Sequence, residues 1–195
     1  MLNESWGVPR IYEDEQQQHF ARSLYHLAHA QDTSRLVIAN DGWELTENDI
    51  CAFHTYKHGA DDDLRQQEKF RRGLKSLEGM PDLVEKTMFA KGFGYEGQPV
   101  LLTEIGGISL NTDPDDDGSW GYTGAADADA FVKAYERLIE SIYESELIFG
   151  YCYTQTTDIE HEMNGLLDEA HEFKVAPEII KEINDRRPTS GAFMV

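Results

Sequence analysis

Positively charged residues are scarce in this chain. Lysine and arginine total 17 against 37 aspartate and glutamate residues, so the formal net charge is −20 over 195 residues. Nucleic acids and anionic membrane surfaces carry negative charge and would be repelled, which excludes both as expected partners. A neutral ligand is easier to accept.

Long apolar runs and a leader are also lacking. No stretch approaches the roughly 20 apolar residues of a membrane-spanning helix. The opening Met1-Leu2-Asn3-Glu4 has neither the basic nor the apolar region of a signal peptide. We therefore expect no membrane partner and a cytoplasmic location.

Cysteine is limited to Cys51 and Cys152, which lie in two separate apolar runs without metal-ligand spacing. Both are expected to be buried free thiols. The sequence contains no Gly-x-Ser-x-Gly elbow and no glycine-rich phosphate loop, which argues against an unrelated doubly wound hydrolase. We expect neither a metal nor another cofactor.

The most informative stretch is the apolar run at residues 99–107, Pro-Val-Leu-Leu-Thr-Glu-Ile-Gly-Gly. It predicts a buried strand of a parallel sheet that ends in a carboxylate, Glu104. A buried glutamate needs partners or a use for its ionisation, so catalysis and the capping of a neighbouring helix are both open from this stretch alone.

A second acidic residue, Glu4, occupies a similar place in Asn3-Glu4-Ser5-Trp6-Gly7. Two carboxylates that end two different strands suit hydrolysis of a glycosidic bond. One carboxyl group protonates the leaving oxygen while the other attacks the sugar carbon.

Five motifs, in this order, resemble glycoside hydrolase family 2, the group of β-galactosidases, β-glucuronidases and β-mannosidases. They are Asn3-Glu4-Ser5-Trp6-Gly7, Asn40-Asp41-Gly42-Trp43-Glu44, Asp49-Ile50 to His54-Thr55-Tyr56, Leu102-Thr103-Glu104-Ile105-Gly106-Gly107, and Gly150 to Glu160 with Asn164-Gly165-Leu166. The resemblance implies an α/β fold with parallel strands: a partial (β/α)8 TIM barrel, roughly strands 4 to 8 with their helices. The length agrees, since a complete barrel takes about 250 residues.

The resemblance also implies a retaining glycoside hydrolase of β-galactoside-like sugars, with Glu4 as general acid/base and Glu104 as nucleophile. Retention requires the two carboxyl groups to lie about 5 to 5.5 Å apart. Asn3 would hold the sugar's 2-hydroxyl, and His54 or Tyr56 would bond to the nucleophile or the sugar. The other expected substrate-binding residues stand at strand ends or in a loop: Asp41, Trp43, Trp120, Tyr153 and Gln155. Many related barrels carry tryptophan where this chain has Tyr153 and Gln155, which leaves the sugar preference open.

Two aromatic residues and two histidines have a second interpretation. Trp43 suits a sugar platform, but it could equally pack under a loop. Trp120 lies in a long loop that either covers the sugar or is a solvated acidic segment. His54 and His58 are four residues apart, as in some metal pairs, but no third ligand is nearby.

Apolar spacing predicts a single domain over residues 1–195, with a tail at 187–195. Helices are expected at 13–30 (with Phe20, Leu24, Leu27 and Ala28 inward), 61–77 (with Leu64, Phe70 and Leu74 inward), 81–90, 127–145 and 177–186. Strands are expected at 35–39, 49–56, 99–107 and 147–153.

The competing class is a non-catalytic carbohydrate-binding or scaffold segment of a larger protein. A barrel without its first three strands would also have open edges, which invite pairing. The expected partners are therefore a carbohydrate substrate and either the rest of a parent barrel or a second copy. The isolated segment is expected to have little or no activity.

Overall fold

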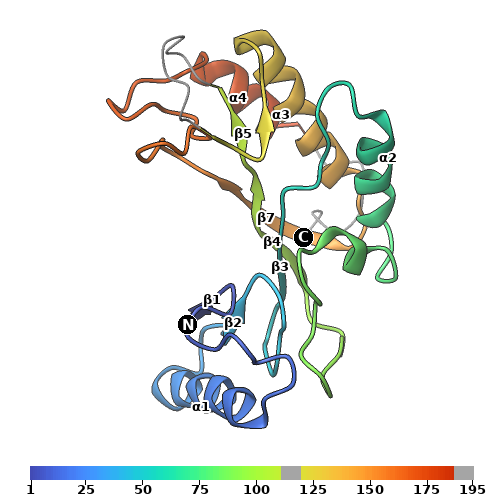
Figure 1. Cartoon of the computed structure of the whole chain (residues 1–195), viewed down its shortest axis with the longest axis vertical. Coiled ribbons are helices and arrows are strands. Elements are labelled where there is room, and N and C mark those ends of the chain that lie inside the picture. Colours follow the sequence, from blue (N-terminus) through green and yellow to red (C-terminus); the bar gives the residue numbers. More distant parts are fainter. Residues whose placement is uncertain (111–119, 187–195) are drawn as a thin grey trace.

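The computed structural model describes residues 1–110 and 120–186, a mixed α/β arrangement with parallel strands (Figure 1). Its strands are β1 (Leu2–Asn3), β2 (Asn40–Asp41), β3 (Cys51–Thr55), β4 (Val100–Gly106), β5 (Ile108–Ser109), β6 (Thr123–Gly124) and β7 (Ile148–Thr154). Its helices are α1 (Glu15–Gln31), α2 (Leu64–Gly73), α3 (Ala128–Tyr143) and α4 (Pro177–Asn184), with a 3-10 turn η1 (Met80–Leu83).

The strands that form the centre of the fold stand side by side in sequence order. β4 lies between β3 and β7, and both pairings are parallel. β1 pairs with β2 in the same sense, and the amide of His54 in β3 donates to the carbonyl of Gly42 just after β2 at 3.2 Å. Consecutive parallel strands bring their carboxyl ends to one edge, which is where Glu4, Asp41, His54 and Glu104 lie.

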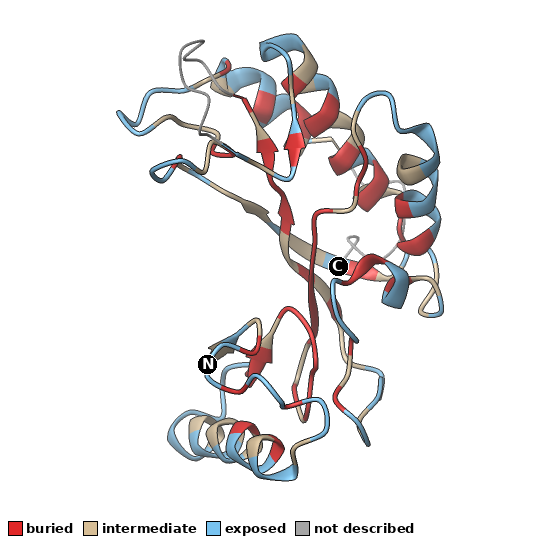
Figure 2. Ribbon diagram, viewed as in Figure 1, coloured by how far each residue is buried: buried red, intermediate tan, exposed pale blue. Residues whose placement is uncertain are grey.

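The main core lies between the β3-β4-β7 sheet and the helices α2, α3 and α4, which Figures 1 and 2 show together in the upper half of the molecule. Helix α3 begins at Asp127, whose carboxylate accepts a hydrogen bond from the amide of Ala130 at 2.8 Å. The predicted stripe of α3 is confirmed, since its members are all at most 1% exposed: Phe131, Tyr135, Leu138, Ile139 and Ile142.

A smaller apolar cluster joins α1 to the β1–β2 pair and contains Val8, Ile11, Ala21 and Ala39. The α1 prediction was correct in extent and partly correct in its inward face. Leu24 and Ala28 are half-buried, but Phe20 and Leu27 are 50% and 55% exposed, whereas Gln18 and Ala21 are buried. The Gln18 amide donates to the carbonyls of Ile11 and Tyr12 at 3.0 and 3.1 Å, so a polar residue serves the packing of this helix.

Two further predicted elements differ in the structure. Residues 35–39 form no regular strand, because the amides of Val37 and Ala39 bond to the side-chain oxygens of Asp49 and Asn48 instead of a neighbouring strand. Residues 81–90 form only the end of η1. The chain at 87–90 then runs beside residues 44 and 45, where Leu45 donates to Met88 and receives from Ala90.

Two residues expected to be buried are exposed. Leu64 opens α2 and is 71% exposed, although Phe70 and Leu74 are buried as predicted. Cys152 is exposed on β7, while Cys51 is buried as expected. The tail at 187–195 and the acidic part of the long loop, 111–119, lie outside the described residues. None of the described helices combines the length and apolarity needed to cross a membrane.

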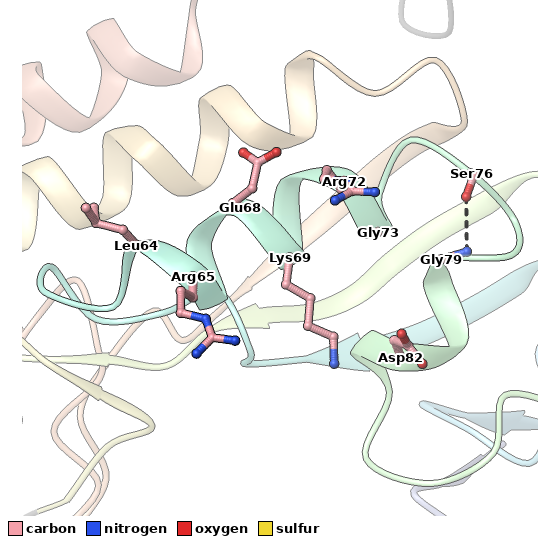
Figure 3. Close-up of a pocket in the computed structure, with 9 residues that line it drawn as sticks. All are labelled: Leu64, Arg65, Glu68, Lys69, Arg72, Gly73, Ser76, Gly79 and Asp82. Atoms are coloured by element: carbon pink, nitrogen blue, oxygen red, sulfur yellow. Dashed lines mark hydrogen bonds between the residues drawn. The ribbon is translucent and has the colours of Figure 1, made fainter.

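A cavity of about 600 Å³ lies between α2 and η1, away from the strand ends. Figure 3 shows Arg65, Lys69 and Asp82 among its lining residues, with Ser76 accepting a hydrogen bond from the amide of Gly79. None of the sequence-predicted site residues lines this cavity.

Candidate functional site

Glu4 and Glu104 approach each other at the carboxyl ends of their strands, although they are a hundred positions apart in the sequence. Glu4 follows β1 and Glu104 lies in β4. One oxygen of each carboxylate and one ring nitrogen of His54 all lie within 4.8 Å of one another. The two carboxylates remain accessible, with side-chain exposures of 23% and 30%.

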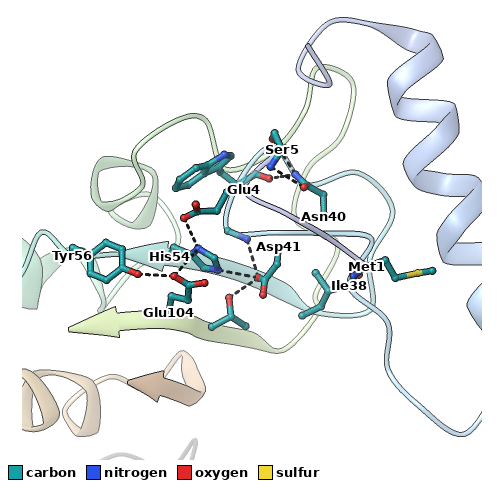
Figure 4. Close-up of polar contacts among 12 residues, drawn as sticks. Met1, Glu4, Ser5, Ile38, Asn40, Asp41, His54, Tyr56 and Glu104 are labelled. Atoms are coloured by element: carbon teal, nitrogen blue, oxygen red, sulfur yellow. Dashed lines mark hydrogen bonds and ion pairs between the residues drawn. The ribbon is translucent and has the colours of Figure 1, made fainter. Parts of the chain in front are cut away.

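His54 stands at the centre of this acidic group and is completely buried. Its Nδ1 lies 3.0 Å from Glu4 Oε1 and 3.5 Å from Glu104 Oε2, and its Nε2 lies 3.5 Å from Asp41 Oδ1 (Figure 4). Burial lowers the pKa of His54, but hydrogen bonds with Asp41 and Glu4 and the charge of Glu104 outweigh it and leave the pKa above its ordinary value of 6.5.

Asp41 is fixed from several sides. The hydroxyl of Thr103 donates to its Oδ1 at 2.6 Å, and the amide of Gly42 donates to the same oxygen at 2.8 Å. Burial favours the neutral acid, but the hydrogen bonds from His54 and Thr103 prevail, so the pKa of Asp41 lies below its ordinary value. Asp41 is therefore a carboxylate at neutral pH.

Tyr56 orients Glu104. Its hydroxyl donates to Glu104 Oε2 at 2.6 Å, and burial together with this carboxylate raises the pKa of Tyr56. The Tyr56 ring stacks on Tyr122 with centroids 3.6 Å apart. Gly107 permits this contact. Its φ is +63°, and a Cβ there would collide with the Tyr122 ring and stand 2.9 Å from Tyr56 Cδ1.

The backbone at Glu4 is held in an uncommon conformation. Glu4 and Ser5 have φ values of 51° and 60°, which non-glycine residues seldom adopt. The buried side chain of Asn40 accepts from the amide of Ser5 at 3.1 Å and donates to the carbonyl of Trp43 at 2.8 Å. The Ser5 hydroxyl donates to Glu44 Oε2 at 2.5 Å. Sequence reasoning assigned no role to Ser5, Asn40 or Glu44, although all three stand within the motifs.

Several predicted sugar-binding residues are buried or packed against other side chains. Trp43 is only 9% exposed and meets the His54 ring edge-on at 5.9 Å, which fits the packing interpretation. Tyr153 packs against Tyr135 and Gly106, and its hydroxyl donates to the carbonyl of Asn164 at 3.4 Å. His54 cannot contact a sugar directly because it has no exposed surface.

The remaining predicted residues are more accessible. Asn3 is exposed, Gln155 is half-buried, and Trp120 is 48% exposed beside Tyr122, with ring centroids 5.6 Å apart. Tyr122 is itself 51% exposed. Because Tyr122 stacks on Tyr56, it links the exposed aromatic pair to the nucleophile candidate.

Within residues 1–110 and 120–186, the donor atoms of Glu4, His54 and Glu104 are the ones grouped closely enough to hold a metal ion. Their contacts with one another account for the grouping without an ion. His58 takes no part, since its Nε2 bonds to the carbonyl of Gly106 at 2.8 Å and burial lowers its pKa to about 4. The structure therefore gives no support to a His54–His58 metal pair.

Comparisons with known proteins place the fold among glycoside hydrolases. No family model matches the sequence, and no curated protein does. A Bifidobacterium dentium β-glucuronidase, solved with coumarin-3-O-glucuronide, matches 89% of this chain with a TM-score of 0.59 and 17% identity. Two structures of GH2 β-galacturonidases from Eisenbergiella tayi, bound to galacturonate and to glycerol, match 87% and 94% of it, with TM-scores of 0.54 and 0.53 and identities of 14% and 13%.

The chain spans 28%, 30% and 35% of the length of these three proteins. Likeness at such low identity shows a shared fold. The chain is therefore glycosidase-like in its architecture over most of its own length.

Proposed function

We propose that this chain is the catalytic part of a retaining glycoside hydrolase, built as strands 4 to 8 of a (β/α)8 barrel. The observation that carries the proposal is the approach of Glu4 and Glu104, whose nearest oxygens lie within 4.8 Å. Retaining enzymes need about 5 to 5.5 Å between their carboxyl groups, whereas inverting enzymes leave room for a water molecule at about 6.5 to 9.5 Å. The sequence order of the parallel strands further supports the barrel.

In the proposed reaction Glu104 attacks the anomeric carbon and the bond to the leaving oxygen breaks. Glu4 gives that oxygen a proton, and a covalent glycosyl-enzyme forms. Glu4 then takes a proton from water, whose oxygen releases the sugar and frees Glu104. The hydrogen bond from Tyr56 holds Glu104 Oε2, so the other oxygen of this carboxylate is the one available to attack.

We infer a neutral, β-galactoside-like sugar as the substrate. Within the described ranges, none of the ionic contacts of Glu4, Asp41 and Glu104 involves lysine or arginine. A uronic acid would bring a further negative charge to a group of three carboxylates whose one basic contact is the buried His54. The proposed sugar therefore differs from the glucuronide and the galacturonate bound in the structural neighbours.

The test uses activated aryl glycosides with good leaving groups, because these depend least on the general acid. The chain should release the aryl group from the β-galactoside faster than from the β-glucuronide. Glu104→Gln should lower this rate by at least about 10³-fold, since the variant removes the nucleophile. Glu169→Gln, at an exposed carboxylate, is the matched control. Because the isolated segment is expected to have little activity, the relative rates decide: an E104Q variant that retains the wild-type rate, or faster release from the β-glucuronide, would contradict the proposal.

The alternative is a non-catalytic carbohydrate-binding segment, which the exposed pair Trp120 and Tyr122 favours. Aromatic faces stack on the CH surfaces of sugars. A binding segment would show saccharide affinity that Trp120→Ala removes and Glu104→Gln leaves intact, with no release of the aryl group by either chain.

We also propose that another polypeptide segment covers the open edge at β1, either the rest of a parent barrel or a second copy. A hollow of about 510 Å³ lies there, lined among others by Met1, Leu2, Ala28 and Leu36. Met1 and Leu36 are 59% and 66% exposed. Exposed apolar residues beside an unpaired strand edge favour pairing with another chain. Light scattering should detect an assembly larger than one copy, or thermal unfolding should show a weakly cooperative melt. A strictly monomeric chain with a sharp melt contradicts this proposal.

A further inference from the structure

His54 is completely buried, so its ring cannot contact a substrate and must act through its neighbours. Such a polar side chain needs partners for its nitrogens. Within residues 1–110 and 120–186, the charged groups in contact with it are carboxylates, and they come from separate elements. Glu4 follows β1, Asp41 lies in β2 and Glu104 lies in β4.

The two ring nitrogens divide these carboxylates between them (Figure 4). Nδ1 is the nearer to both Glu4 and Glu104, at 3.0 and 3.5 Å. Nε2 faces Asp41 at 3.5 Å. A ring with protons on both nitrogens hydrogen-bonds Glu4 through Nδ1 and faces Glu104 and Asp41 as ion pairs at 3.5 Å, whereas Nε2 has no hydrogen-bond partner of its own.

Its surroundings prevent the ring from turning away. Gly42 lies so close that a Cβ there would stand 2.9 Å from His54 Nδ1, and Trp43 borders the ring edge-on. Asp41 is in turn fixed by Thr103 and Gly42. The imidazole is therefore locked between the two candidate catalytic carboxylates on one side and an anchored anion on the other.

We propose that His54 is a positioning residue that stores the proton of the general acid, sharing it between its Nδ1 and Glu4 Oε1. The inference rests on the proposed function. The transfer is balanced within the chain, since imidazolium and Glu4 carboxylate become neutral imidazole and Glu4 carboxylic acid. Glu4 then gives this proton to the leaving oxygen, and the proton that Glu4 later takes from water returns to Nδ1. Asp41 holds the remaining proton on Nε2 throughout.

The geometry has a second consequence for the resting site. A positive ring within 3.0 Å of Glu4 and 3.5 Å of Glu104 offsets the repulsion between them and sets their separation. The raised pKa of His54 agrees with this arrangement.

The test follows the ring nitrogens of His54 by ¹⁵N NMR during a pH titration of the 195-residue chain. His54→Asn identifies its signals among those of the seven histidines. We expect the ring to keep both protons above pH 6.5 and to titrate at lower pH in Glu4→Gln and in Asp41→Asn, with no change in the control Glu169→Gln. A ring that titrates near 6.5 in the wild-type chain, or at the wild-type pH in E4Q, would overturn the proposal.

The NMR titration does not depend on turnover, so it tests the role of His54 separately from the proposed hydrolase function. A shared proton in a chain without turnover would leave the storage correct and the proposed function wrong. Where turnover is measurable, His54→Leu should lower kcat by about 100-fold with little change in KM and shift the pH–rate profile. His54→Asn restores one donor and should recover part of kcat. Equal losses in the two variants with an unchanged pH profile would show a merely structural residue.

Discussion

Replacing Glu4 by glutamine removes one charge from the acidic group while keeping the shape of the side chain. Two opposing interactions are lost together. One is the attraction to His54, whose Nδ1 lies 3.0 Å from Glu4, and the other is the repulsion from Glu104, whose oxygen lies within 4.8 Å. The sign of the change in folding stability therefore depends on the charge of His54.

The two interactions can be compared with one effective dielectric constant. At a value of 20, a unit attraction at 3.0 Å is worth about 5.5 kcal/mol and a repulsion at 4.8 Å about 3.5 kcal/mol. With His54 protonated, Glu4→Gln should destabilise the chain by about 2 kcal/mol at most. With His54 neutral, relief of repulsion should instead stabilise it by up to about 3.5 kcal/mol. Both values shrink because the Glu4 and Glu104 side chains are 23% and 30% exposed.

The pH window follows from the pKa of His54, which the fold raises. Such a group contributes stability that is fully present below its unfolded value of 6.5 and is lost as the pH rises through the folded value. Urea denaturation of the wild-type chain and of E4Q over a pH series from 6 upward should give a free-energy difference that changes sign as the pH rises through the folded pKa of His54. A difference that keeps one sign and size across this range would refute the charge assignment of His54.

Three further outcomes are expected from other parts of the structure. Lys174 and Asp158 form an ion pair 2.6 Å apart with side-chain exposures of 1% and 0%. Lys174→Met should lower the free energy of unfolding in urea by about 3 to 5 kcal/mol, because Asp158 would remain charged and buried. Adding Asp158→Leu should recover most of this loss. Gly107→Ala should lower the melting temperature, whereas Gly94→Ala, which meets no atom within 4 Å, should leave it nearly unchanged; equal effects would contradict the steric argument. Hydrogen bonds from Tyr25, Val37 and His29 outweigh the burial of Asp49 and lower its pKa, so stability should fall as the pH drops below 3.8; Asp49→Asn should flatten this acid dependence in thermal melts, and an unchanged slope would exclude Asp49 as its source.

The elements with strong periodicity could be predicted from the sequence. In α3 the apolar residues at helical spacing pack into the main core, where α2, α4 and β5 also contact this helix. The strands β3, β4 and β7 were predicted within one or two residues of their observed bounds. A continuous apolar run between turn signals favours a buried strand of an α/β sheet, although β7 leaves Phe149 and Cys152 exposed.

Predictions failed where polar side chains replaced backbone partners. At Val37 and Ala39 the amides bond to Asp49 and Asn48, so the apolar run at 35–39 joins the β1–β2 ladder only through the carbonyl of Ala39, which accepts from Leu2. In α1 Gln18 takes an inward position, and its side-chain amide donates hydrogen bonds to two backbone carbonyls. Such hydrogen bonds join residues that no spacing rule connects, and only the folded chain brings them together.

The candidate site divides in the same way. Strand-end carboxylates could be identified as Glu4 and Glu104 because acidic residues after apolar runs are conspicuous, and the approach of the two groups follows from parallel strands ending at one edge. The place of His54 could not be assigned, because alternation along β3 does not reveal that a carboxylate approaches the ring from each of three elements. The choice between the two interpretations of Trp43 was beyond the sequence for a similar reason, since Asn40 bonds to its carbonyl in the turn where its ring packs inward.

The backbone at Glu4 offers an argument for function that does not depend on any resemblance. Non-glycine residues with positive φ cost about 1 to 3 kcal/mol each when the conformation is strained, and Glu4 and Ser5 adopt it in succession. Asn40 and Glu44 offset this cost by bonding the Ser5 amide and hydroxyl, which requires two buried polar side chains of their own. A glycine at position 4 would remove the strain without these partners, but it would also remove the carboxylate beside His54. Several polar contacts therefore hold one acid group, in a strained backbone conformation, 3.0 Å from a buried imidazole. Strain of this kind is typical of functional sites, which supports the chemical role that we propose for Glu4.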